Sequence, residues 1–160
     1  MSLAVVHTRA QVGVEAPEVT VEIHLSGGLP ALSIVGLPET AVKESKERVR
    51  SALITSGFEF PQRRITINLA PADLPKEGGR YDLAIAVGIL AASKQIPPEA
   101  IKGQEFLGEL ALSGQIRPVR GVLPAAVACD KVGRSLLLAT ENAAEAAIVR
   151  SLPIYPMPHL

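Results

Sequence analysis

Residues 65–93 constrain the fold of this chain more than any other part of the sequence. The first six, Ile-Thr-Ile-Asn-Leu-Ala, alternate and are rich in β-branched side chains, which predicts a strand. Residues 81–93 are apolar on every side, which predicts a helix buried all round. Two prolines and two glycines punctuate the loop over 71–80. This order places loop N–H groups at the N-terminus of a buried helix, a geometry that suits an anion or a reaction site.

The composition is that of a globular protein, with 160 residues, 48% of them apolar and 20% charged. Aromatic residues make up 3%, so the core must consist of Ala, Val, Ile and Leu. Acidic and basic residues number 16 each, which gives no support for a strong nucleic-acid binder but leaves a local patch open. The single cysteine, Cys129, excludes an internal disulfide and is interpreted as a small buried hydrophobe. Without a signal peptide or an apolar run of transmembrane length, we expect a cytoplasmic protein with no membrane partner.

The first third of the chain predicts three strands and a helix. β-rich runs over 3–12, 14–25 and 30–37 indicate an antiparallel meander or a pair of hairpins. A helix is then expected to begin at Pro38 and to end at Gly57. Its buried stripe consists of apolar residues at helical spacing, namely Val42, Val49, Ala52 and Leu53.

Short strands and helices follow the buried helix. The expected elements are a connector over 95–104, a β-hairpin of 106–112 and 115–119, a helix over 123–130, a strand over 136–139 and a helix from Asn142 to Arg150. Asn142 and Glu145 have the spacing of a capping box. Residues 153–160 indicate an edge strand that runs into a linker. The predicted fold class is therefore α+β.

Acidic and imidazole side chains offer two weak candidates for chemistry. Asp73, Glu77 and Asp82 cluster around the loop, where two carboxylates can do acid–base work or hold Mg²⁺. We favour a structural interpretation, in which Asp82 stabilises the start of the buried helix and the other two are solvated. His7 and His24 can face each other across the first two strands, but two exposed strand histidines are the simpler interpretation than a zinc site.

Four cations near the loop form the candidate binding surface. Lys76 and Arg80 lie on the loop, and Arg63 and Arg64 come just before the central strand. Together they can contact an anion or a nucleic acid, although no aromatic residues interleave with them to stack on bases. If the two pairs lie at opposite ends of the strand, the patch splits, and Lys76 with Arg80 is the better pair. A solvated, salt-bridged surface is an equally ordinary outcome.

Two long motifs resemble a known family. Residues 35–52 and 69–86 are similar to the N-terminal domain of the ComM/YifB family, which are magnesium chelatase-like AAA+ ATPases. The resemblance implies a Lon-protease-like fold of the ribosomal protein S5 domain 2 type, with a mixed sheet and packed helices, over residues 1–152. It implies that residues 153–160 lead towards an AAA+ ATPase module. ATP and Mg²⁺ are expected only in that module, and no cofactor or metal in this chain, which has neither a P-loop nor a dinucleotide fingerprint.

The resemblance to Lon proteases can be followed through the catalytic dyad. Residues 75–78 match the start of the Lon motif Pro-Lys-Asp-Gly-Pro-Ser-Ala-Gly, and Arg80 takes the position of the nucleophilic serine. Residues 117–122 match the turn before the Lon lysine, and Leu123 takes the position of that lysine. A guanidinium cannot act as a nucleophile, and the leucine side chain has no group that accepts a proton. We therefore expect no peptidase activity and no catalytic residue.

The resemblance implies a role as a non-catalytic accessory domain of a hexameric DNA helicase that drives branch migration in natural transformation. Its partners would be its own AAA+ module, the neighbouring subunits of a homo-hexamer and DNA, contacted through Lys76, Arg80, Arg63 and Arg64. The loop pattern also resembles the Lon-like domain of the recombination helicase RadA, which contacts DNA. The alternatives are a residual Lon-like serine peptidase or metal-assisted hydrolase, and a magnesium chelatase-type subunit. No residue pattern here supports a porphyrin site.

Overall fold

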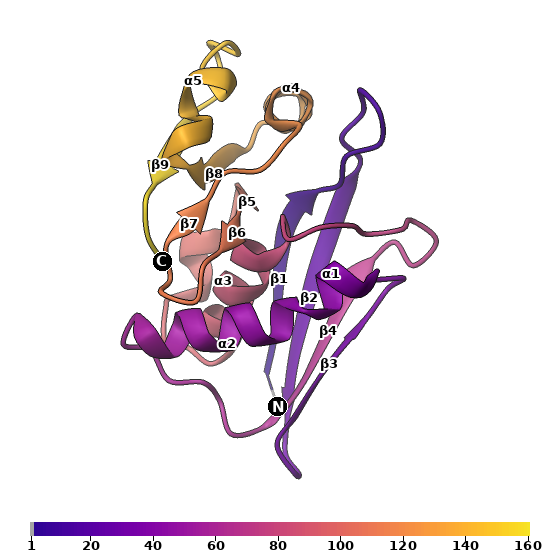
Figure 1. Ribbon diagram of the computed structural model, residues 1–160, viewed down its shortest axis with the longest axis vertical. Helices are drawn as coiled ribbons and strands as arrows, with labels where there is room; N and C mark the ends of the chain where they lie inside the picture. The colour runs from indigo at the N-terminus through magenta and orange to yellow at the C-terminus, as the bar shows by residue number, and fades with distance from the viewer. Residues whose placement is uncertain (1) are drawn as a thin grey trace.

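A mixed sheet of seven strands runs through the protein, in the order β3-β4-β2-β1-β5-β8-β9 (Figure 1). The computed structural model describes residues 2–160. The strands of this sheet are β1 (Ser2–Arg9), β2 (Glu18–Ser26), β3 (Ala31–Val35), β4 (Arg64–Ala70), β5 (Gln104–Leu107), β8 (Ser135–Ala139) and β9 (Ile154–Met157). Strand β2 is antiparallel to β1 and β4, and the other neighbouring strands are parallel.

Helices pack against this sheet in two groups. The α-helices are α1 (Thr40–Lys43), α2 (Ser45–Thr55), α3 (Asp82–Ala92), α4 (Val122–Lys131) and α5 (Ala143–Ala146), with 3₁₀ turns η1 (Pro98–Ile101) and η2 (Thr140–Asn142). Helix α3 packs on β1 and β2, and α2 packs on α3, whereas α4 and α5 lie beside β8 and β9 (Figure 1). The result is a mixed α/β fold with a mostly parallel sheet. Among residues 2–160, no helix has the length and apolar character needed to cross a membrane.

The buried helix predicted after the central strand is confirmed as α3. All eleven of its residues are buried, including Asp82. Gly88 allows the helix to lie close to the sheet, because a Cβ at this position would stand 2.5 Å from Cγ1 of Ile23 on β2. The helix therefore forms the centre of the larger core, as its uniformly apolar sequence predicts.

The predicted N-terminal meander is only partly correct. Strands β1 and β2 form the expected antiparallel hairpin, but β3 pairs in parallel with β4 rather than with β2. The physical reason is the intervening pair of helices, since a helical crossover returns the chain in the same direction. Those helices include the predicted stripe of buried residues, but Glu44 separates α1 from α2 where one continuous helix was expected.

The predicted capping box before the last helix is wrong. Asn142 instead bonds the backbone of Val119 twice, donating to its carbonyl at 3.0 Å and accepting from its N–H at 2.9 Å. Glu145 Oε2 accepts from the N–H of Leu123 at 2.8 Å. Asn142 therefore holds the turn before α4 and Glu145 holds the first turn of α4 itself, and α5 is one short turn rather than a helix to Arg150.

The C-terminal residues belong to the folded unit. Strand β9 pairs in parallel with β8 at the edge of the sheet, which confirms the predicted edge strand. Beyond it, the Pro158 carbonyl accepts from the N–H of Ile116, and the Leu160 N–H donates to the Gly114 carbonyl. These bonds tie the tail to the hairpin of β6 (Glu109–Leu110) and β7 (Ile116–Arg117), which was itself predicted. The segment predicted as a linker over 153–160 is thus packed against the domain in this structure.

Candidate functional site

The loop between β4 and α3 lies against the segment that connects β3 to α1. Lys76 exchanges backbone hydrogen bonds with this segment, donating to the Leu37 carbonyl at 3.2 Å and accepting from the Glu39 N–H at 3.0 Å. The N–H of Gly78 donates to Glu39 Oε1 at 3.1 Å. The loop N–H groups that the sequence offered to an external anion are therefore partly used inside the protein.

Lys76 is fully buried, contrary to the prediction of a surface contact. Its Nζ donates to the carbonyl of Gly36 at 2.6 Å and to the carbonyl of Pro71. Burial lowers the pKa of Lys76, and the charge of Asp73 opposes this shift only in part. The side chain ties the start of the loop to the segment that follows β3, and it leaves no ammonium surface for a nucleic acid.

Arg80 is also buried, with 7% of its surface exposed. Its Nε donates to the carbonyl of Arg9 at 2.9 Å, and its Nη1 donates to the carbonyl of Arg120 at 2.9 Å. Its Nη2 is buried and has no hydrogen-bond partner among the described residues. Burial lowers the pKa of Arg80. The guanidinium thus joins the end of β1, the loop and the turn before α4.

Asp82, in the first turn of α3, accepts hydrogen bonds from three residues on two other segments. Its carboxylate accepts from Ser45 Oγ at 2.7 Å, from Arg48 Nε at 2.6 Å and from the N–H of Leu110 at 3.1 Å. The hydrogen bond from Arg48 to Asp82 raises the pKa of Arg48. Asp82 lies in the first turn of α3, as expected, but its carboxylate caps no N–H of that helix and instead links α3 to α2 and β6. Asp73 and Glu77 are exposed, as expected.

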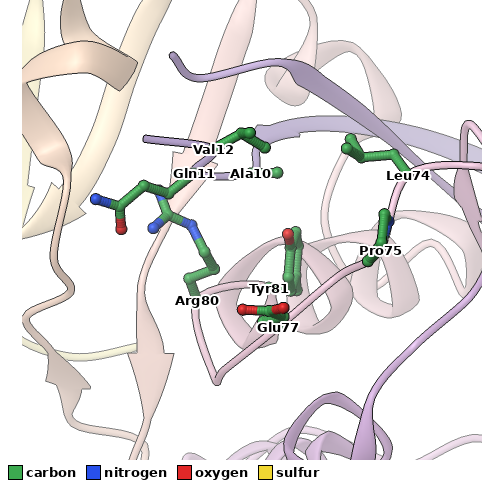
Figure 2. Close-up of a pocket in the computed structure, with 8 residues that line it drawn as sticks. All are labelled: Ala10, Gln11, Val12, Leu74, Pro75, Glu77, Arg80 and Tyr81. Atoms are coloured by element: carbon green, nitrogen blue, oxygen red, sulfur yellow. The ribbon is translucent and has the colours of Figure 1, made fainter. Parts of the chain in front are cut away.

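A pocket of about 340 Å³ opens beside Arg80 (Figure 2). Figure 2 shows Tyr81 in its centre, with Leu74 and Pro75 on one side and Arg80 with Gln11 on the other. Its eight lining residues are Ala10, Gln11, Val12, Leu74, Pro75, Glu77, Arg80 and Tyr81. Burial raises the pKa of Tyr81 to about 12, so its phenol stays neutral. Five of the lining residues are apolar or carry a neutral phenol, and the other three supply one guanidinium, one amide and one carboxylate.

A second groove shares part of this lining. Gln11, Glu77 and Arg80 line both spaces, and the groove adds two acids, Glu39 and Glu109, and one further cation, Arg120. Arg80 thus belongs to the lining of both the pocket and the groove.

Arg63 and Arg64 lie at the opposite end of β4. Arg64 is the first residue of the strand, is exposed, and stands opposite Ser26 of β2. Arg63 lines a small groove with Arg50 and Phe60, and the Arg50 guanidinium lies 5.4 Å from the centre of the Phe60 ring. The prediction of one basic surface made by all four cations is therefore wrong. The patch splits, as the alternative predicted, but the more accessible pair is Arg63, which is half-buried, and Arg64, which is exposed, rather than the loop pair.

The two histidines do not face each other. His7 is opposite Thr20 and His24 is opposite Leu3 in the β1–β2 register. Between residues 2 and 160, no group of three or more His, Cys, Asp or Glu side chains is placed to hold a metal ion. Cys129 is fully buried, and burial raises the pKa of its thiol to about 12, as suits the predicted buried hydrophobe.

The two positions that the resemblance to Lon proteases aligns with the dyad, Arg80 and Leu123, lie on neighbouring segments. The bond from Arg80 to the Arg120 carbonyl places the loop beside the turn that leads to Leu123. Leu123 is half-buried in the first turn of α4 and lines an apolar groove with Val127. Neither side chain supplies a nucleophile or a base.

Sequence reasoning missed a buried ion pair between the strands. Arg9 binds Glu105 through two parallel bonds of 2.8 Å, and Arg134 Nη1 lies 3.1 Å from the same carboxylate. Glu105 is 1% exposed and stands in an apolar strand. A lone acid in such a strand is the signal that predicts a buried partner. The pair joins β1 to β5 and is structural.

Comparison with known proteins gives a consistent result. Residues 21–142 match the protein family described as subunit ChlI of Mg-chelatase. The chain is 56% identical over its whole length to the uncharacterized protein YifB of Salmonella typhimurium, and 57% identical over 97% of its length to the competence protein ComM of Haemophilus influenzae. It covers 32% and 30% of these two proteins, so it spans about a third of their length. It is also 30% identical to Lon protease 2 of Bacillus subtilis, over 65% of this chain and 18% of that protein.

Proposed function

This chain belongs to the magnesium chelatase ChlI-like family that includes ComM and YifB, and on that basis we propose that it is a non-catalytic accessory domain of a larger AAA+ ATPase. ATP and Mg²⁺ bind to a separate module of that protein in this proposal. The partners of the domain are that module and the neighbouring subunits of a homo-hexamer. The whole machine acts on DNA as a branch-migration helicase in natural transformation, in keeping with the name competence protein borne by the relative from Haemophilus influenzae.

Arg80 is the observation that carries the non-catalytic role. A Lon-like fold is part of the proposal, and the 30% identity to Lon protease 2 and the adjacency of the loop to the turn before Leu123 support it. In that fold, Arg80 occupies the place of the nucleophile. Its guanidinium is held by two backbone carbonyls and cannot act as a nucleophile or a base. The remnant of the catalytic site has become a structural clamp.

In this proposal the domain contacts DNA through the start of β4 rather than through the loop. Arg64 is exposed, and Arg63 shares a groove with Arg50 and Phe60. Phosphate groups are bound by accessible cations, and a ring repeats even a weak patch around its circumference. The zero net charge of the chain makes the affinity of a single domain low.

Loss of peptidase chemistry is tested on the chain itself. The purified domain is incubated with unfolded casein and, separately, with a fluorophosphonate. We expect no cleavage and no labelled serine, because the Ser/Lys dyad is absent. Stoichiometric labelling of any serine would revive the residual-peptidase alternative.

The accessory role is tested in a chimera. The matching region of ComM from Haemophilus influenzae is replaced by this chain, and the transformation frequency is measured. Reversal of Arg63 and Arg64 to Glu is expected to lower that frequency and to reduce the salt dependence of DNA binding by about two units of slope. Reversal of Lys102 and Lys131, two exposed cations elsewhere, serves as the matched control. A full loss of hexamers in the Arg variant alone would assign this surface to subunit packing instead.

A further inference from the structure

Arg80 is a buried cation whose charge is not neutralised inside the protein. No carboxylate of residues 2–160 lies within ion-pair distance of its guanidinium, and both acceptors that it does contact are neutral carbonyls. Arg9, by contrast, is equally buried and has Glu105 as its partner. Buried charges in proteins are normally paired, because an unpaired one loses its hydration without compensation. Arg80 therefore lacks a counter-ion.

The unused donor of Arg80 lies just beneath the surface beside this pocket. Nη2 is buried and has no partner among the described residues, while Arg80 is one of the residues that line the space. Gln11 lies beside it in Figure 2 and lines the same pocket. The Gln11 amide rests against Gly121, where an added Cβ would stand 2.5 Å from Gln11 Cδ. Gln11 is exposed, so its side chain can turn to admit a ligand and then donate to it.

We propose that this pocket binds a carboxylate that is attached to a small apolar group. One carboxylate oxygen accepts from Arg80 Nη2 and the other from the Gln11 amide, while the apolar group lies against Val12, Leu74 and Tyr81. The negative charge of the carboxylate complements the positive guanidinium, and the apolar walls favour such an acid over inorganic phosphate. A free amino-acid-like acid and the C-terminus of a peptide share this chemistry.

The charge of Glu77 should influence how tightly the pocket binds a carboxylate. Its exposed carboxylate lines the pocket and opposes an incoming anion. Glu77→Gln should therefore tighten carboxylate binding by a factor of about two to five at low salt. A merely structural role for Arg80 does not predict this change, because Glu77 is not one of the partners of Arg80.

The probes are N-acetyl-leucine and its neutral analogue N-acetyl-leucinamide, titrated into the ¹⁵N-labelled chain while the Arg80 Nε–H signal is followed by NMR. We expect the acid to shift this signal and the amide to bind at least about tenfold more weakly. Arg80→Met should abolish binding, and Gln11→Ala should weaken it. Equal shifts with both probes, or none at Arg80, would overturn the proposal.

Glu77→Gln keeps the test valid even where Arg80→Met does not fold, because Glu77 is exposed. Glu99→Gln, an exposed acid in η1, is its control and should leave binding unchanged. Unaltered affinity in Glu77→Gln would also overturn the proposal. The tripeptide Ala-Ala-Leu with a free C-terminus distinguishes the sources. Binding about tenfold tighter than that of N-acetyl-leucine would identify a peptide terminus, and equal binding would identify a small acid.

Discussion

The two ends of strand β4 both carry a pair of cations, and the environments of the two pairs differ completely. At the start of the strand, Arg64 is exposed and Arg63 lies in a shallow groove. After the strand, Lys76 is 0% exposed and Arg80 is 7% exposed. All four residues look alike in the sequence as candidates for phosphate contact. The difference shows that the local density of positive charge says little about whether the charge reaches the surface.

Carbonyl groups explain the burial of the loop pair. Lys76 donates to Gly36 and Pro71, and Arg80 donates to Arg9 and Arg120. Irregular backbone that is withdrawn from water needs donors for its carbonyls, and long cationic side chains can supply them. Arg64 does not need to donate to buried carbonyls in this way, because the backbone of β4 is already hydrogen-bonded on both sides by strands β2 and β3.

The largest expected effect on stability comes from Asp82, which fixes the end of the loop that follows β4. Asp82→Ala should cost about 3–5 kcal/mol, because it leaves Arg48, Ser45 and the Leu110 N–H without their acceptor. Chemical denaturation measures the change. Asp73→Ala, an exposed acid of the same loop, should alter stability by less than about 0.5 kcal/mol. A cost below about 1 kcal/mol for Asp82→Ala would show that the loop end is not rigidly anchored.

A direct comparison of the two ends uses two substitutions to the same residue. Lys76→Met should destabilise the protein by about 1–3 kcal/mol, since two carbonyls lose their donor. Arg64→Met should change the free energy of unfolding by less than about 0.5 kcal/mol. Equal effects of the two substitutions would contradict the assignment of one cation as structural and the other as free.

The smallest effect is a dependence on alkaline pH. Burial lowers the pKa of Lys76 in the folded state below its ordinary value of 10.5. Between the lowered pKa and 10.5, the unfolded chain binds the proton that the folded chain has released, so Lys76 makes the free energy of unfolding rise with pH in that window. The stability of the wild type relative to Lys76→Met should therefore increase there. The stability of the wild type relative to Arg64→Met should not change with pH in this window. If neither difference in stability changes with pH, the Lys76 pKa is not shifted.

Local patterns predicted the regular parts of the fold well. Helix α3 follows from an uninterrupted apolar segment, β2 from strict alternation, and the β6–β7 hairpin from the turn at Ser113 and Gly114. In each case the signal that identifies the element is a pattern of residue types close in sequence. Pairing of β3 was mispredicted because strand partners come from distant segments, and β4 lies between β3 and β2 only in the folded sheet.

The candidate site shows the same division between local and distant contacts. Asp82 was correctly placed at the start of a buried helix, but its carboxylate bonds α2 and β6 rather than that helix. Asn142 and Glu145 have the spacing of a capping box, yet they reach across to the turn before α4 and to the first turn of α4. Their side chains satisfy distant backbone groups in preference to the local ones, a choice that spacing alone cannot reveal.

The sequence by itself determined the buried helix, the apolar character of the core and the presence of Arg80 and Leu123 where the Lon motif has serine and lysine, since these depend on residue type and local order. Only the tertiary structure decided which cations reach solvent. Arg80 bonds carbonyls that lie 71 and 40 positions away in the chain. The fold brings those acceptors together, and the withdrawal of water from the loop then makes the cations donors to the backbone instead of a surface for phosphate.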